Sequence, residues 1–321
     1  MAEAWVGRAR LKLEKKAWKD AQAFAEKALT LDANVPDGHL VLGTALWKLG
    51  ELEPATKELE SARSGGSNSR LEVTLAAVRL EKGDPDNAAA LLAAVLKAEP
   101  GNPEANYWMA RVHHKKADYS LALESIRAAI DRAPSRASYH YESGLILKDS
   151  GKLPEAMEAW RTAVKLDPGY ADAWEAIGQG YLDVNRSKEA IAAFESALKA
   201  DPQRTRILGS IGDVHFQAGK WSQAVASYQA ALKADPKITS LNFRLGRAYS
   251  EQGQYDKAIG FYQKALTATP DNAQAWYHLG YAWKERGKKR EAVNAFQSYL
   301  AKAPDAKDRK EIEDEIYFLS K

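Results

Sequence analysis

Six histidines are the side chains in this sequence best suited to bind a metal ion or to transfer a proton near neutral pH. They are His39, His113, His114, His140, His215 and His278. None of them stands at the HExxH spacing or at a similar metal-ligand spacing. His113 and His114 are adjacent, so on a helix they point about 100° apart and cannot both face one ion. We interpret all six as structural or surface histidines.

Motifs for phosphate binding or covalent catalysis are also missing. The sequence contains no GxxxxGK[ST] loop, no GxSxG nucleophile elbow and no cysteine. Gly178, Gln179 and Gly180 resemble the start of a dinucleotide fingerprint, but no strand is predicted before them. A cluster of carboxylates near the C-terminus favours a solvated helix face over an acid–base pair; its members are Glu311, Glu313, Asp314 and Glu315. We therefore expect a non-enzymatic chain with no catalytic residue, no metal site and no cofactor.

The strongest pattern in the chain is a spacing of 34 residues. Seven of the twelve prolines keep it: Pro100, Pro134, Pro168, Pro202, Pro236, Pro270 and Pro304. A glycine series keeps the same spacing at Gly144, Gly178, Gly212, Gly246 and Gly280. A series of large aromatic residues follows it at Trp160, Phe194, Tyr228, Tyr262 and Phe296. A fixed period of this length indicates an array of one repeated supersecondary unit.

The residue pattern within each 34-residue unit predicts two helices. In the unit 171–204, apolar residues fall at helical spacing over about 171–183 and again over about 187–200. Small residues at Gly178 and Ala190 let the two helix axes approach closely, and Phe194 fills the space beside them. One such pair cannot bury its apolar stripe alone. Successive pairs must therefore stack, which produces a continuous core along the array.

This pattern resembles the tetratricopeptide repeat, TPR. The unit 273–306 carries the expected residue types in order, at Trp276, Leu279, Gly280, Gly287, Ala292, Phe296 and Pro304. Period and phase agree in seven successive units. The resemblance implies an all-α, right-handed superhelical α-solenoid of about nine helical hairpins with a C-terminal capping helix.

The phase divides the chain into nine units: 2–35, 36–68, 69–102, 103–136, 137–170, 171–204, 205–238, 239–272 and 273–306. The pair within 1–68 is degenerate, and its second unit is one residue short. That unit ends in a Ser-Gly-Gly-Ser-Asn run over 64–68, where we expect a loop or joint. Residues 69–306 hold seven regular units, and 307–321 form the capping helix. We expect one elongated solenoid overall.

The charge and hydropathy of the sequence limit the classes of partner and the cellular compartment that we expect. The charges nearly balance, with 46 basic and 43 acidic residues, so bulk electrostatics does not favour nucleic acid. No apolar run approaches the roughly 20 residues that a transmembrane helix needs. No signal peptide is visible after Met1, so we expect a cytoplasmic protein. A periplasmic or membrane-tethered location is the alternative, should the chain be a processed fragment.

The resemblance also implies where a partner binds. In TPR proteins the first helix of each hairpin lines a concave groove, and the second, fifth, ninth, twelfth and thirteenth places of a unit are exposed there. These places, with the sixth beside them, hold two groups of aromatic and cationic residues. One group is Tyr107, Arg111 and Tyr141; the other is Phe243, Arg244, Arg247, Tyr277, Tyr281 and Lys284. Such residues often dominate interface energy, and arginine binds carboxylates through two hydrogen bonds.

We therefore expect a scaffold or adaptor that binds a protein or peptide ligand of acidic and apolar character in this groove. The Ala-rich, cysteine-free sequence favours a bacterial multiprotein assembly. The fifth and ninth places lack the lysine and asparagine pattern of the carboxylate-clamp subfamily, so we do not expect a chaperone tail as ligand. Two alternatives remain open: a self-assembling structural TPR protein, and the TPR region of a larger enzyme or membrane-anchored protein.

Overall fold

The computed structural model describes every residue from Met1 to Lys321. It contains 19 α-helices and no strand, which confirms the predicted all-α class. The helices form two compact units, Met1–Asp167 and Pro168–Lys321. The boundary between the units falls inside the stretch 69–306 that the sequence presents as one regular array. The predicted boundaries at 68 and 306 stay predictions.

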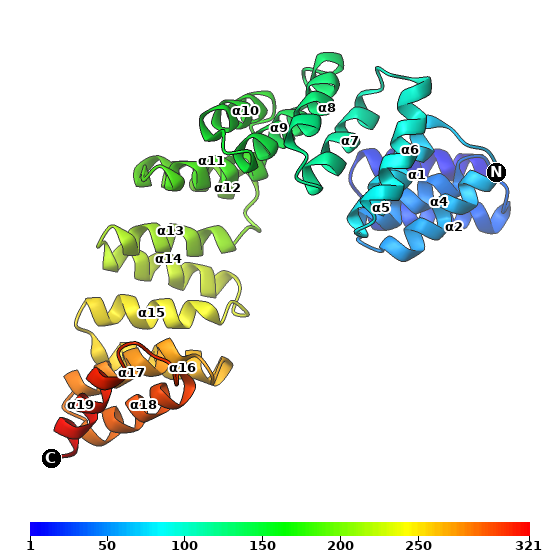
Figure 1. The fold of residues 1–321 in the computed structure, drawn as a ribbon. Helices are drawn as coiled ribbons and strands as arrows, with labels where there is room; N and C mark the ends of the chain where they lie inside the picture. Colours follow the sequence, from blue (N-terminus) through cyan, green and yellow to red (C-terminus); the bar gives the residue numbers. More distant parts are fainter. The chain divides into compact units, whose positions relative to one another are not determined.

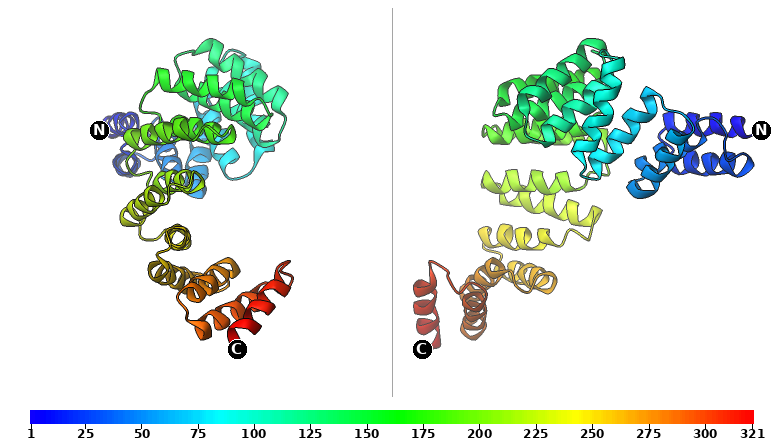
Figure 2. Two further views of the ribbon diagram at one scale, coloured as in Figure 1. Left: turned by 90° about the vertical axis from the view of Figure 1, so that its left-hand side faces the viewer. Right: turned by 45° about the vertical axis from the view of Figure 1, so that its right-hand side comes forward.

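The helices pair into hairpins in both units, and Figures 1 and 2 show each pair followed by the next within a unit. The N-terminal unit has five hairpins: α1(Ala2–Glu14) and α2(Trp18–Leu31), α3(Gly38–Lys48) and α4(Leu52–Ser64), α5(Ser69–Glu81) and α6(Pro85–Ala98), α7(Pro103–Lys115) and α8(Tyr119–Arg132), α9(Ala137–Asp149) and α10(Leu153–Leu166). The C-terminal unit has four hairpins and a last helix: α11(Ala171–Asp183) and α12(Ser187–Ala200), α13(Arg206–Gln217) and α14(Trp221–Ala234), α15(Ser240–Glu251) and α16(Tyr255–Ala268), α17(Ala273–Glu285) and α18(Lys289–Lys302), then α19(Arg309–Ser320). These nine hairpins and the last helix confirm the predicted count. We call the two helices of a hairpin its first and second helix.

The turn inside each hairpin needs one residue in the left-handed conformation, at the fifteenth place of the unit. Glycine fills this place in six hairpins, for example Gly219 with φ +70° and Gly253 with φ +69°. In the other three hairpins Lys16, Ala117 and Asn185 adopt φ between 57° and 60°. The turn is therefore set by the geometry of the hairpin, and glycine is the residue that adopts it at least cost.

The glycine series and the aromatic series meet inside the five hairpins from α9/α10 to α17/α18. A Cβ built on Gly246 would lie 2.5 Å from the ring of Tyr262, which is fully buried. Gly280 stands at the same distance from Phe296, and Gly178 from Phe194. The second helix thus places an aromatic ring directly against the backbone of the first, and any side chain at the glycine would displace the ring.

The prolines of the 34-residue series accept hydrogen bonds in the loops between hairpins. In four of the 34-residue repeats, the side chain at the fourth place donates a hydrogen bond to the carbonyl oxygen of the proline six residues earlier. Asn106 Nδ2 lies 3.1 Å from Pro100 O, and Trp276 Nε1 lies 2.9 Å from Pro270 O. His140 and Trp174 make the same bond. Each bond ties the start of a first helix to the loop before it.

The last helix packs against the final hairpin. Ile312 is buried, and Ile316 and Leu319 join the same core cluster as Phe296 and Tyr299. These contacts confirm that the predicted capping helix covers the last hairpin. The opposite side of α19 exposes Tyr317 and Phe318.

Replacing Gly246 with Ala should destabilise the C-terminal unit by about 1–3 kcal/mol, because the new methyl group meets the Tyr262 ring. Gly260→Ala is the matched control: Gly260 lies in the middle of α16 with open space around it. That change should stabilise the chain by roughly 0.5–1 kcal/mol through helix propensity. Urea denaturation of both variants measures the two effects. Equal stability of the two variants would contradict the proposed packing.

Trp276→Phe should cost about 0.5–1.5 kcal/mol more than Trp283→Phe, because only Trp276 loses a hydrogen bond, the one to Pro270 O. Both tryptophans lie half-buried on α17, so the packing lost is similar. Thermal unfolding of the two variants gives the difference. A larger loss for Trp283→Phe would show that the proline carbonyl bond contributes nothing.

Candidate partner-binding surfaces

The first helices of the N-terminal unit surround a hollow of about 830 Å³. Side chains from α3, α5, α7 and α9 line it, and we call it the aromatic hollow. Its aromatic and cationic residues are Trp47, Lys48, Arg70, Tyr107, Trp108, Arg111, Arg136 and Tyr139. The sequence-predicted residues Tyr107 and Arg111 therefore lie together in one concave site.

The rings of the aromatic hollow form a continuous wall. Trp47 and Trp108 have ring centroids 5.6 Å apart, although they come from different hairpins. Tyr107 meets Trp108 edge-on at 5.3 Å and stacks on Tyr139 at 5.0 Å. Burial raises the pKa of Tyr107 to about 12, so its hydroxyl stays protonated at neutral pH. The wall is thus apolar and uncharged, as an anchor site for an apolar side chain requires.

Two cations lie on this wall. The Arg111 guanidinium carbon is 4.5 Å from the Trp108 ring centroid, and Lys48 Nζ is 3.3 Å from that of Trp47. Lys48 is an exposed residue, but partial desolvation of its ammonium beside the rings lowers its pKa, even though the nearby Glu81 acts in the opposite direction. Because these π faces already hold cations, the hollow does not favour a cationic ligand.

Of the two carboxylates in the aromatic hollow, only Glu104 has a cationic partner within ion-pair distance. Glu81 Oε2 accepts a hydrogen bond of 2.8 Å from Trp47 Nε1, and Glu104 pairs with Arg136 at 3.3 Å. Lys48 and Arg70 form no ion pair with any carboxylate. The hollow therefore presents more unpaired positive than negative charge, beside an aromatic wall.

A buried carboxylate positions Arg111. Glu142 is 5 % exposed, and its side chain lies 3.6 Å from Arg111 Nε and 3.1 Å from His114 Nδ1. His114 also contacts Asp149 at 2.8 Å through Nε2. The hydrogen bond with Glu142 raises the pKa of His114. His114 thus bridges two carboxylates of α9, which is a structural role.

Tyr141, the third residue of this predicted group, does not line the aromatic hollow. It lies half-buried on α9, and its backbone oxygen accepts a hydrogen bond of 3.2 Å from Trp160 Nε1. Its neighbour Tyr139, which the sequence did not single out, stacks on Tyr107 instead. Whether Tyr141 contacts a partner stays a prediction.

The C-terminal unit has a second hollow, of about 560 Å³, between α13, α14 and α15. Its residues include the predicted Phe243, Arg244 and Arg247, and we call it the C-terminal hollow. Arg244 pairs with Asp213 across the two first helices. The Arg247 guanidinium carbon lies 4.6 Å from the Phe216 ring centroid, and Arg247 pairs with no carboxylate. An aromatic ring and an unpaired arginine thus recur here.

Burial keeps one histidine beside this hollow neutral. His278 stacks on Tyr262 at 6.0 Å and lies 5.7 Å from Phe243. Burial, with the nearby Arg247 charge, lowers the pKa of His278 to about 4. The ring therefore acts as packing beneath Phe243 at neutral pH.

The remaining predicted residues, Tyr277, Tyr281 and Lys284, form a separate group. The two tyrosines have ring centroids 4.9 Å apart and pack in the cluster that α19 completes. Lys284 Nζ contacts both carboxylate oxygens of Glu315 on α19 at 2.7 Å. The sequence interpretation placed Glu315 on a solvated face; it is in fact half-buried in this ion pair. The single C-terminal cluster is thus two groups of residues, of which the first lines the C-terminal hollow.

Sequence reasoning missed Trp47, Lys48 and Arg70. They stand at the twelfth and thirteenth places of the unit 36–68 and at the second place of the unit 69–102. These are places interpreted as exposed, so the same rule applied to the units 36–68 and 69–102 would have found them. Tyr139 stands at a third place, for which the rule makes no prediction.

The structure offers no metal site and no membrane span. No group of three or more His, Cys, Asp or Glu side chains is arranged to share a metal ion. None of the helices combines the length and the apolar character needed to cross a bilayer.

Several solved structures have similar folds. The C-terminal part of a TPR repeat-containing protein from Cytophaga hutchinsonii matches with a TM-score of 0.66 at 17 % identity, over 75 % of this chain and 98 % of that chain. PilF of Pseudomonas aeruginosa matches with a TM-score of 0.54 at 19 % identity, over 66 % and 97 %. YrrB, described as a TPR protein with an unusual peptide-binding site, matches with a TM-score of 0.53 at 21 % identity, over 60 % and 99 %. These likenesses show the fold. No curated protein sequence matches the chain.

Two family models match the sequence. The C-terminal domain of cilia and flagella-associated protein 70 matches residues 20–269, and the tetratricopeptide repeat matches residues 243–307. The first covers more than half of the chain, and the second falls on the units whose residues show the repeat best. Together with the nine hairpins, they establish that the chain belongs to the tetratricopeptide repeat family.

Proposed function

We propose that this chain is a non-enzymatic scaffold that binds partner segments on the surface formed by its first helices. The segments carry carboxylates beside apolar side chains. One observation supports this most directly: in each of the two compact units, aromatic rings line a hollow next to cations that pair with no carboxylate. In the aromatic hollow these cations are Lys48 and Arg70, and in the C-terminal hollow the cation is Arg247.

The energetics favour a carboxylate over a neutral ligand. A ligand carboxylate near Lys48 would restore the charge stabilisation that partial desolvation of this ammonium removes. Arg111 and Arg247 are held against aromatic rings, so little side-chain entropy is lost when they bind a ligand. An apolar side chain of the ligand adds burial against the rings, which is the usual basis of a binding hot spot.

The proposal places this chain in a multiprotein assembly, as a protein that holds others together. YrrB is described as having a peptide-binding site, and two similar structures come from bacteria. These likenesses support a peptide as the ligand and a bacterial setting. The charge and the anchor of the ligand are inferred from the residues of this chain alone.

A synthetic peptide that alternates aspartate with phenylalanine should bind the full chain, and binding should weaken in Lys48→Ala/Arg70→Ala and in Arg247→Ala. We expect each variant to lose about 2 kcal/mol at its own hollow, or roughly 30-fold in affinity. Isothermal titration calorimetry at low and high salt measures the loss. The wild-type affinity should also fall with salt.

Two controls separate the hollows from general charge. Arg127→Ala on α8 and Lys233→Ala on α14 remove exposed cations from second helices of the two units and should leave the affinity unchanged. A peptide with asparagine in place of aspartate should bind far more weakly. The proposal fails if the asparagine peptide binds equally well, or if the control variants lose as much affinity as the hollow variants.

A further inference from the structure

Within each compact unit, one face of a first helix packs against the hairpin before it. The third, seventh and tenth places of the 34-residue repeat form this face. In α17 they are Ala275, Leu279 and Ala282, which are buried in one core cluster with Tyr262 of α16. In all seven repeats that follow another hairpin of the same compact unit, the residues at the third and tenth places are buried. This face is therefore a contact surface for a preceding hairpin.

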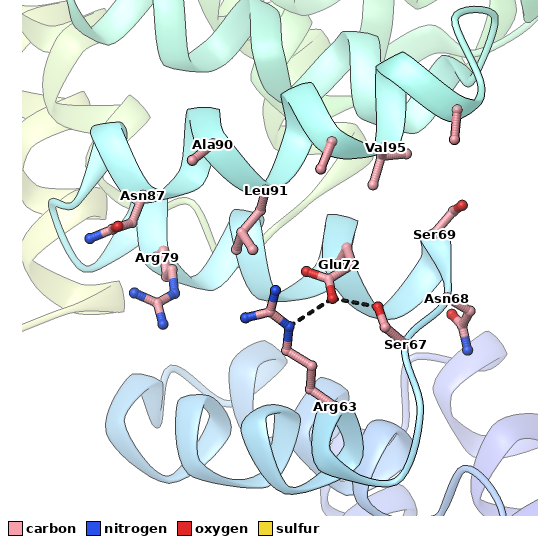
Figure 3. A pocket seen from close by; sticks show the side chains of 12 residues that line it. Arg63, Ser67, Asn68, Ser69, Glu72, Arg79, Asn87, Ala90, Leu91 and Val95 are labelled. Atoms are coloured by element: carbon pink, nitrogen blue, oxygen red, sulfur yellow. Dashed lines mark hydrogen bonds and ion pairs between the residues drawn. The ribbon is translucent and has the colours of Figure 1, made fainter.

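The burial of this face persists at an irregular junction, between α4 and α5. Glu72 there stands at the fourth place, where four other repeats have a donor to the proline carbonyl oxygen. Its carboxylate accepts hydrogen bonds from Arg63 and Ser67 instead (Figure 3). Leu71 and Val78, at the third and tenth places of this repeat, are nevertheless buried. The face is thus covered even where the loop before the helix departs from the pattern.

The same face of α1 is open. Its third, seventh and tenth places hold Ala4, Arg8 and Leu11, and all three residues are exposed. Lys15 follows on the same side of the helix, four residues after Leu11. A Cβ built on Gly7 would meet no atom within 4 Å, so the surface beside these residues is shallow. We call these five residues the α1 face.

The last helix exposes a second apolar surface. One side of α19 packs on the final hairpin, while the other side exposes Tyr317 and Phe318, whose ring centroids are 5.8 Å apart. Asp314 stands one turn before these rings, and we call the three residues the α19 face. After Met1, the most exposed large apolar residues of the chain are Phe318 at 67 %, and Tyr317 and Leu11 at 57 % each. Exposed apolar surface therefore concentrates on the first and last helices, as it does at interaction sites.

The two faces complement each other in shape. The α1 face is shallow, because alanine and glycine stand at Ala4 and Gly7. The α19 face projects two aromatic rings. Inside the hairpins of this chain, an aromatic ring packs directly on a glycine, as Phe296 does on Gly280. A ring of the α19 face can make the same kind of contact with the open side of α1.

The charges of the two helices are also complementary. Residues 2–16 carry five cations against two carboxylates, and α19 carries four carboxylates against two cations. Arg8 lies over the Trp5 ring at 4.7 Å and pairs with no carboxylate. On α19, Glu313 pairs with Arg309 and Glu315 with Lys284, which leaves Asp314 without a cation. Two α1 faces would repel each other, as would two α19 helices, whereas one of each attracts.

We infer that the α19 face of one copy of this chain binds the α1 face of a second copy. The rings of Tyr317 and Phe318 pack on the shallow strip of α1, and Asp314 pairs with Arg8. Because the two faces differ, one copy can bind a second copy through its first helix and a third through its last helix. Neither face contains a residue of the two hollows, so this inference does not depend on the proposed function.

Sedimentation equilibrium of the full chain, from about 1 µM to about 1 mM, measures the association. The mean mass should rise with concentration above the 35.4 kDa of one chain. Leu11→Asp and Phe318→Asp should each remain monomeric, because each places a carboxylate inside the contact. A 1:1 mixture of these two variants should form a complex of two chains and nothing larger. The intact α19 face of the first variant then meets the intact α1 face of the second.

Two controls identify the surface. Leu121→Asp changes an exposed leucine of α8 and should associate as the wild type does. Lys48→Ala/Arg70→Ala should do the same, which distinguishes this contact from binding of one copy in the aromatic hollow of another. A wild-type chain that stays monomeric over the whole range would overturn the inference. So would association of Leu11→Asp at wild-type strength, or a mixture of the two variants that forms no two-chain complex.

Exchange of charge tests the ion pair. Arg8→Glu and Asp314→Arg should each weaken association about tenfold, because each brings two like charges together. The double variant Arg8→Glu/Asp314→Arg restores opposite charges across the contact and should regain most of the wild-type association. A double variant that associates more weakly than both single variants would contradict the pairing of these two residues.

Discussion

The contact between a glycine backbone and an aromatic ring is the constraint on which the rest of this molecule depends. At Gly246 and Tyr262, and again at Gly280 and Phe296, ring and backbone lie too close for any intervening side chain. This contact fixes how the second helix of a hairpin rotates against the first. Once the rotation is fixed, the side chains that pack and those that face outward follow from their places in the unit. The positions of the candidate binding surfaces therefore follow from the place of each residue in its repeat.

The sequence predicted the hairpins well because similar packing contacts between the two helices recur every 34 residues. It predicted part of the candidate site for the same reason: Tyr107 and Arg111, and Phe243 with Arg247, line hollows as their phase indicates. Prediction was weaker where a residue's surroundings come from an irregular element. Lys284 is held by Glu315 of the last helix, which has no equivalent in the repeat.

Degeneracy in the sequence marks the places where this chain differs from a regular array. The first two units depart from the repeat, yet the second contributes Trp47 and Lys48 to the aromatic hollow. At the next junction the change to Glu72 replaces a proline-carbonyl bond by a buried carboxylate with an unsatisfied oxygen. These departures cannot be inferred from the period, because they depend on which neighbouring side chains replace the lost bond.

The central claim is that partners bind on the first helices beside aromatic rings. The indole N–H signals of the tryptophans in a ¹⁵N-labelled full chain test it most directly, during titration with the aspartate–phenylalanine peptide. Trp47 and Trp108 line the aromatic hollow, whereas Trp276 is tied to Pro270 O outside both hollows. The account predicts shifts of the Trp47 and Trp108 signals at peptide concentrations that leave Trp276 unchanged. Saturated binding with no shift at Trp47 or Trp108 would contradict it.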